Sequence, residues 1–210
     1  MQSLTLPFPS EFDRINHKKI CMHNIPFEEC FREKTDFNQY WYSAETIAAI
    51  CDEILNIAPT SVAFLSTPSL FFATHTKLRD ATLFEFDAAF QSIAGQSFVF
   101  WDFRYPSFDR VHSNAYDMVI MDPPFIDSQV IEAYIGAFHI LARGPGCRLL
   151  LTSTLENGDS IQEYMRVPIH VANFLPRIPN LVYQYRIFVN YVLREESPLR
   201  QSNELIKQLH

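Results

Sequence analysis

Beyond Pro59, short apolar runs alternate with segments of helical periodicity. The apolar runs cover residues 61–65, 82–87, 96–101, 116–121 and 147–152. This alternation is typical of βαβ units, in which helices cover a parallel sheet. Two later runs, 169–174 and 183–192, flank the loop 176–180, which is short enough for an antiparallel hairpin. We therefore predict an α/β fold with a mostly parallel sheet that closes in a C-terminal antiparallel hairpin.

Helices are expected on both sides of these strands. Ser43 is a good N-cap for a helix that ends before Pro59, with Glu45 in its first turn. Ser69 can cap a second helix, which runs to about Arg79. Further helices are predicted over 127–142, with Gly144 as the C-cap, and over 160–166.

Charge and composition restrict the class of partner. The 210 residues fit one domain, and 24 acidic against 17 basic side chains give a net charge of −7. Because nucleic-acid binding depends on Lys and Arg at phosphates, this balance makes a nucleic-acid partner unlikely and suits a basic protein or a small molecule. No apolar run approaches the roughly 20 residues of a membrane span, and the first 13 residues do not resemble a signal peptide. We expect no membrane partner.

The four cysteines are scattered and form no C-x-x-C pair, which indicates a reduced, cytoplasmic protein. Cys21, His23 and Cys30 are the one grouping with metal-ligand chemistry, but their spacing matches no usual zinc pattern and a fourth ligand is missing. We therefore predict no metal site.

Three successive predicted strands end in an acid, namely Asp87, Asp102 and Asp122. Strand ends are exposed and often acidic, so one such residue says little, but three in order at the carboxyl edge indicate a ligand crevice. An acid after the second strand can hold two ribose hydroxyls. Glu85 competes with Asp87 for this role, and we favour Asp87 because it stands at the strand tip. Asp102 is placed to accept from an adenine amino group.

The first strand is followed by Ser66, Thr67, Pro68 and Ser69 without any glycine. A nucleotide fold normally has a glycine-rich turn here, which lets the backbone approach a phosphate. A dinucleotide with a pyrophosphate is hard to seat on such a loop. This departure argues against NAD more than against S-adenosylmethionine.

The fourth strand ends in Asp122, Pro123, Pro124 and Phe125, a stiff turn because two prolines continue neither a sheet nor a helix. Methylation of a nitrogen requires its lone pair to point at the methyl donor, so its hydrogens must be held elsewhere. The Asp122 carboxylate and the Pro123 carbonyl can accept those hydrogens, while the Phe125 ring packs against the group that bears the nitrogen. This arrangement suits either a planar base amine or a lysine.

With these residues in place, the chain resembles the Rossmann-like, seven-stranded class I methyltransferases once described as N6-adenine-specific. It is most similar to the elongation-factor-1-alpha lysine methyltransferase family. The resemblance is carried, in the family's order, by 39–43, 66–69, 84–87 with Phe90, 98–103, 117–125, 176–177 and 189–191. It implies a methyltransferase domain over 36–193, between an irregular arm over 1–35 and a tail over 194–210. It also implies methyl transfer from S-adenosylmethionine to a lysine of that basic translation factor.

The resemblance also implies roles for individual residues. Asp122, Pro123 and Phe125 would be catalytic, with Phe at position 125 where the family usually has Tyr. The cofactor residues would be Gln39, Ser66, Thr67, Pro68, Glu85, Asp87 and Asp102. Trp41, Tyr42, Phe125 and Arg177 would contact the substrate. Two alternatives stay open: adenine-N6 methylation of DNA or RNA, and a non-catalytic binding module with a methyltransferase fold.

Overall fold

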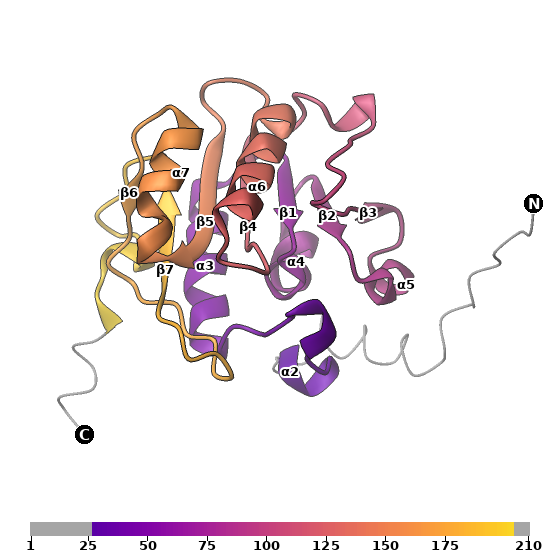
Figure 1. Cartoon of the computed structure of the whole chain (residues 1–210), viewed down its shortest axis with the longest axis horizontal. Coiled ribbons are helices and arrows are strands. Elements are labelled where there is room, and N and C mark those ends of the chain that lie inside the picture. Colours follow the sequence, from indigo (N-terminus) through magenta and orange to yellow (C-terminus); the bar gives the residue numbers. More distant parts are fainter. Residues whose placement is uncertain (1–26, 204–210) are drawn as a thin grey trace, which may run out of the picture.

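The computed structural model describes residues 27–203, which form one seven-stranded sheet flanked by helices (Figure 1). The strands lie in the order β3-β2-β1-β4-β5-β7-β6. Their bounds are β1 Val62–Leu65, β2 Ala81–Glu85, β3 Phe98–Phe100, β4 Met118–Met121, β5 Arg148–Thr154, β6 His170–Val171 and β7 Tyr185–Val189. Strands β1 to β5 are parallel, and β7 runs antiparallel to both β5 and β6. The predicted α/β sheet with a C-terminal antiparallel hairpin is confirmed.

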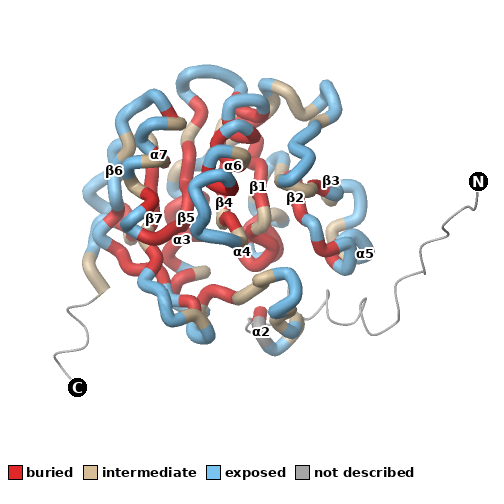
Figure 2. Tube along the Cα trace, in the orientation of Figure 1, coloured by how far each residue is buried: buried red, intermediate tan, exposed pale blue. Residues whose placement is uncertain are grey.

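The helices cover both faces of the sheet, and their bounds are α2 Phe27–Cys30, α3 Ala44–Ile57, α4 Pro68–Thr74, α5 Gln91–Ala94, α6 Ser128–Leu141 and α7 Gly158–Met165. Alternate residues of β1 separate two cores. Val62 and Phe64 pack with α3 and α4, whereas Ala63 and Leu65 pack with α6 and α7. The central strands are therefore buried on both faces, which explains their unbroken apolar sequence (Figure 2).

Three predicted helix boundaries are wrong. Helix α4 begins at Pro68, with Thr67 and not Ser69 at the N-cap, since proline's missing N–H costs nothing in the first turn. It ends at Thr74 and continues only as a 3₁₀ turn, His75–Lys77. Helix α6 ends at Leu141 with Ala142 as its extended C-cap, so Gly144 does not cap it. The Ser43 cap of α3 is confirmed, because its side chain accepts a bond from Thr46 N.

The hairpin strands are shorter than predicted. Strand β6 covers only His170–Val171 and β7 covers Tyr185–Val189, so residues 172–184 form the connection. This longer connection reaches the carboxyl edge of the sheet, where Ile178 and Leu181 line a cavity.

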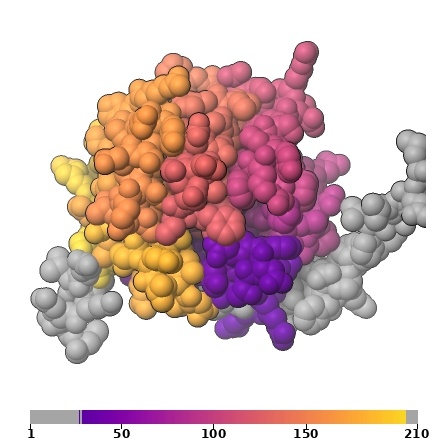
Figure 3. Space-filling model, viewed as in Figure 1, coloured from indigo at the N-terminus to yellow at the C-terminus, as the bar shows by residue number. Residues whose placement is uncertain are grey.

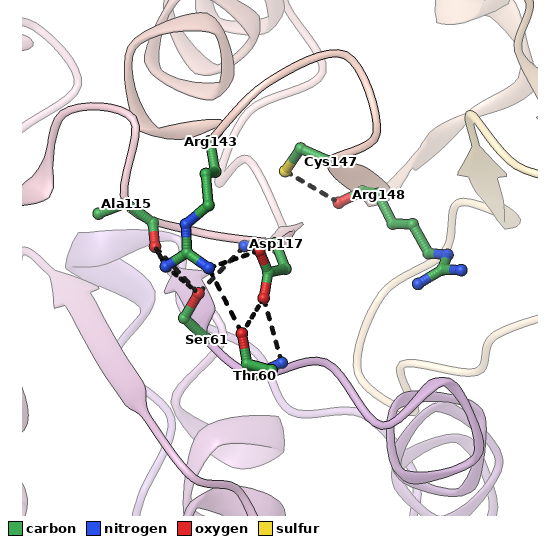
Figure 4. A network of polar contacts seen from close by, with 7 residues as sticks. All are labelled: Thr60, Ser61, Ala115, Asp117, Arg143, Cys147 and Arg148. Atoms are coloured by element: carbon green, nitrogen blue, oxygen red, sulfur yellow. Dashed lines mark hydrogen bonds and ion pairs between the residues drawn. The ribbon is translucent and has the colours of Figure 1, made fainter.

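At the opposite edge of the sheet a polar network joins three segments (Figure 4). Arg143, which follows α6, donates from Nη1 to Asp117 Oδ1 at 2.8 Å and from Nη2 to Ser61 Oγ at 3.1 Å. Arg143 also donates to the Ala115 carbonyl, and the Thr60 hydroxyl donates to Asp117. The network fastens the amino ends of β1 and β4 to the end of α6.

Residues near both ends of the described chain enter the core: Phe27 and Leu199 are buried there. Within residues 27–203, no helix is long and apolar enough to cross a membrane. The same residues contain no cluster of three or more His, Cys, Asp or Glu that could hold a metal ion. Cys21 and His23, considered above as metal ligands, lie outside the described residues.

Candidate active site

A cavity of about 280 Å³ opens at the carboxyl edge of the parallel strands. Backbone hydrogen bonds join the ends of adjacent strands there: Ser66 N donates to Phe84 O, Trp101 N to Glu85 O, and Asp122 N to Leu65 O. The lining side chains come from the carboxyl ends of β1 to β4, from α4, α6 and the start of β7, and from two covering segments. They include Asp36, Phe37, Asn38, Gln39, Tyr40, Trp41, Ser66, Pro68, Glu85, Phe86, Trp101, Asp102, Phe103, Arg104, Asp122, Pro123, Pro124, Phe125, Tyr134, Ile178, Leu181 and Tyr185.

We call residues 33–41 the strap, and residues 36–41 of this segment form one wall of the cavity. The strap folds back on itself through a bridge between Lys34 and Gln39. Asn38 Nδ2 donates to the carbonyl of Pro124, and Lys34 Nζ lies 2.6 Å from Asp87 Oδ2. In the space-filling view the first described residues, drawn in indigo, lie between the C-terminal region and the β2–β3 side of the molecule (Figure 3). The strap therefore ties the turn after β4 to the turn after β2.

The glycine-free turn after β1 achieves its bend with a serine. Ser66 has a left-handed backbone conformation with φ of 54°, which residues other than glycine rarely adopt. Its hydroxyl forms a 2.6 Å hydrogen bond with Tyr134 Oη of α6, a buried side chain, and this bond holds the turn. Ser66 and Pro68 line the cavity, whereas Thr67 does not.

The two acids after β2 have different surroundings. Glu85 is buried and lines the cavity; its Oε1 accepts from Asp87 N at 2.9 Å. Burial raises the pKa of Glu85 to about 7. Asp87 lies outside the lining. Its Oδ1 accepts a hydrogen bond from Ala89 N at 3.1 Å, and its Oδ2 forms an ion pair with Lys34 Nζ. The geometry therefore favours Glu85 over Asp87 as the carboxylate that faces a ligand, the reverse of the preference drawn from the strand tip.

Asp102 lines the cavity after β3 and is paired with Arg104. Arg104 Nη2 donates to Asp102 Oδ2 at 2.6 Å, and Nε donates to Oδ1 at 2.9 Å. These bonds lower the pKa of Asp102. The same guanidinium lies 5.3 Å from the centre of the exposed Phe86 ring. Asp102 is thus a fixed, ionised acceptor at the mouth of the cavity.

Asp122 is half-buried at the tip of β4 and lines the cavity. Its Oδ1 accepts from Thr152 Oγ1 of β5 at 2.6 Å. Thr152 Oγ1 is in turn 2.6 Å from Tyr42 Oη. Desolvation raises the pKa of Asp122 to about 6, even though the hydroxyls of Thr152 and Tyr42 oppose this shift. Asp122 is therefore mostly ionised at neutral pH.

The rest of the Asp-Pro-Pro-Phe turn surrounds this carboxylate. Pro123 is buried, and no described residue donates to its carbonyl, whereas the Pro124 carbonyl is taken by Asn38. The Phe125 ring is 47% exposed and lies edge-on to Phe103, with ring centres 6.3 Å apart. The turn thus lines the cavity with the Asp122 carboxylate, the two prolines and the exposed Phe125 ring.

Three residues expected at the substrate side have other surroundings. Trp41 is a buried wall residue whose Nε1 donates to Phe31 O at 2.9 Å, so it does not close over the opening. Tyr42 is buried behind Asp122 and does not line the cavity. Arg177 is exposed outside the lining, and its backbone bonds the start of α3 through Ser43 and Thr46.

Sequence reasoning missed several residues of this site. Trp101 and Tyr134 line the cavity, and their rings meet edge to face with centres 4.9 Å apart. Thr152 supports Asp122 from β5. The strand register explains this contact: Met121 pairs with Leu151 in parallel strands, so the next residues, Asp122 and Thr152, are neighbours. A polar residue in the apolar run 147–152 could have indicated it.

Two buried polar atoms in the cavity wall lack partners among the described residues, namely Gln39 Oε1 and Trp101 Nε1. Unpartnered buried polar atoms are rare because their desolvation is not compensated. Together with Glu85 and Asp102, they supply donors and acceptors suited to a polar, nucleoside-containing ligand. S-adenosylmethionine, the cofactor expected from the sequence, fits this donor set.

The strand order with one antiparallel strand defines the class I methyltransferase fold. A solved structure with the same fold is a branched-chain polyamine synthase mutein from Thermus thermophilus, with a TM-score of 0.61 and 14% identity, over 85% of this chain and 67% of that chain. Residues 33–193 match the model of a family described as probable N6-adenine methyltransferase. Because this match covers most of the chain, the protein belongs to that family.

Similar proteins carry protein-lysine methyltransferase names. An EEF1A lysine methyltransferase 1 from Bos taurus is 27% identical over 84% of this chain and 79% of its own length. A protein-lysine N-methyltransferase from Dictyostelium discoideum is 30% identical over 76% of this chain and 77% of its own length. The family resemblance found in the sequence is thereby confirmed.

Proposed function

We propose that this chain is an S-adenosylmethionine-dependent protein-lysine N-methyltransferase that acts in the cytoplasm on a basic protein, a translation elongation factor. The observation that carries the proposal is the Asp122–Phe125 turn, which lines the cavity with a carboxylate, two prolines and an exposed ring. The names of the relatives support a lysine as the acceptor and elongation factor 1-alpha as the protein.

Several residues would hold the cofactor. Glu85 is placed for the ribose hydroxyls and Asp102 for the adenine amino group, with Gln39, Ser66 and Pro68 in the adjacent wall. Thr67 and Asp87 would support this wall from behind. The cofactor supplies an electrophilic methyl group on a positively charged sulfur.

The turn would then prepare the amine. A lysine ammonium must lose one proton to solvent before its lone pair can form the new N–C bond, while the S–C bond breaks and its electron pair stays on sulfur. Asp122 and the Pro123 carbonyl would accept the remaining N–H groups and so orient the lone pair. Phe125 would pack along the aliphatic stem and favour the incoming cation.

Adenine-N6 methylation is the second candidate, because it needs the same acceptors and because the family description names it. The net charge of −7 counts against it, since binding to phosphates draws on Lys and Arg. A non-catalytic module predicts no cofactor binding at all.

The test is incubation of the protein and methyl-labelled S-adenosylmethionine with a cell extract. We expect label that is removed by protease and resists nuclease. Asp122→Asn should abolish labelling while calorimetry shows cofactor binding within about threefold of wild type, because Asp122 is assigned to the acceptor. Asp52→Asn, an exposed site on α3, is the matched control and should behave as wild type. Nuclease-sensitive label would support the adenine alternative, and absence of binding heat would support the module.

A further inference from the structure

Asp122 is the end of a chain of buried hydroxyl groups. Thr152 and Tyr42 are 1% and 3% exposed, and neither lines the cavity. Tyr42 Oη to Thr152 Oγ1 and Thr152 Oγ1 to Asp122 Oδ1 each measure 2.6 Å. Thr152 Oγ1 is also 3.4 Å from the Met121 carbonyl, a much longer separation. The short bond is therefore directed at the carboxylate.

The direction of donation along this chain follows from the protonation of Tyr42. Burial, with the nearby Asp122 as a second cause, raises the pKa of Tyr42 well above its usual range, so its hydroxyl keeps its proton. Tyr42 can then donate to Thr152, and the single Thr152 hydrogen is left for Asp122 Oδ1. The Tyr42 hydroxyl also hydrogen-bonds the Asp122 carboxyl, and this bond lowers the pKa of Asp122.

We propose that Thr152 and Tyr42 are positioning residues, which hold the Asp122 carboxylate in one orientation toward the substrate amine. This inference rests on the proposed function. Charge-assisted bonds between hydroxyls and a carboxylate are short and directional, so they fix the side-chain rotamer. They also favour the ionised form, which is the form that can accept an N–H hydrogen.

The other ionisable groups around Asp122 do not replace this pair. Tyr185 of β7 and Tyr134 of α6 have raised pKa values because of burial, so both are neutral. Glu85 and Asp102 line the same cavity, and any negative charge on them would oppose ionisation of Asp122. Loss of either hydroxyl should therefore raise the pKa of Asp122.

The experiment measures that pKa directly. Carbon-13 NMR of aspartate carboxyls is followed against pH in the full chain, and Asp122→Asn identifies the resonance of Asp122. We expect a midpoint near 6 in wild type, and an upward shift of about one pH unit in Thr152→Val and in Tyr42→Phe. Thr152→Ser retains the hydroxyl and should restore the wild-type midpoint.

Matched controls lose comparable buried bonds elsewhere. Thr74→Val removes a 2.6 Å bond to Leu70 O, and Tyr116→Phe removes a 2.7 Å bond to His112. Both should leave the Asp122 midpoint unchanged. In methyl-transfer assays, Thr152→Val and Tyr42→Phe should lose activity at pH 6.5 and recover much of it at pH 8.5, with cofactor affinity unchanged.

An unchanged Asp122 midpoint in both hydroxyl variants would overturn the inference, as would an equal loss of activity at every pH. Absence of transfer in every protein, wild type included, would overturn the proposed function instead. In that case the NMR midpoints still decide whether the pair controls the carboxylate.

Discussion

Glu85 and Asp87 are two buried acids that make different contacts. Asp87 holds the strap through Lys34 and caps the 3₁₀ turn Ala88–Phe90, while Glu85 faces the cavity. We expect Glu85→Gln to weaken S-adenosylmethionine binding about tenfold or more, since a buried charged hydrogen bond is worth about 1.5–3 kcal/mol. Asp87→Asn should weaken it less. Isothermal titration calorimetry of the two variants tests this order, and a larger loss in Asp87→Asn would restore Asp87 as the ligand acid.

The sequence predicted that acids from three strand ends would meet, because parallel strands end at one edge. It ranked Asp87 above Glu85 because Asp87 stands at the strand tip, and the geometry favours the opposite order. Period-two alternation holds only within a strand, and β2 ends at Glu85. Beyond that point Asp87 is directed by its own cap bond and by Lys34, a residue 53 positions away.

At the scale of elements, the strap is the part of the site that sequence patterns could not place. The apolar runs located the strands because the sheet core is apolar, but residues 33–41 have no such periodicity. Their position is set by single long-range bonds such as the one from Asn38 to Pro124. Residues 39–43 therefore carried part of the family resemblance, but their sequence did not show that Trp41 and Tyr42 are buried.

Asn38→Asp tests the strap. Asn38 has a left-handed backbone with φ of 50°, which Asp also tolerates, but Asp cannot donate to the Pro124 carbonyl. We expect faster hydrogen exchange over residues 33–41 and weaker cofactor binding. Asn173→Asp, which loses an exposed bond to Arg200 O, is the matched control and should leave both unchanged. Equal exchange in the two variants would contradict the assignment of the strap.

At the scale of the molecule, the site makes the unliganded fold sensitive to pH. Glu85 and Asp122 have pKa values of about 7 and 6, both raised by burial. The folded state therefore binds more protons than the unfolded state between about pH 4 and 7, so the free energy of unfolding falls as pH rises through this range.

Replacing one of these acids by its neutral amide should remove its part of this loss of stability at high pH. We expect Glu85→Gln to be more stable than wild type by about 2 kcal/mol at pH 8 and to show a flatter dependence on pH. Urea denaturation at pH 5 and pH 8 measures the difference. A Glu85→Gln variant that is less stable at pH 8 would show that the ionised Glu85 is compensated in the folded protein.

The most direct test of the whole account uses purified components: this chain, S-adenosylmethionine and elongation factor 1-alpha, followed by mass spectrometry of the factor's peptides. The account predicts a methylated lysine with the wild-type chain. It predicts no methylation with Asp122→Asn, even when that variant is saturated with cofactor. An unmodified factor, together with methylated adenine in a nucleic-acid substrate under the same conditions, would contradict it.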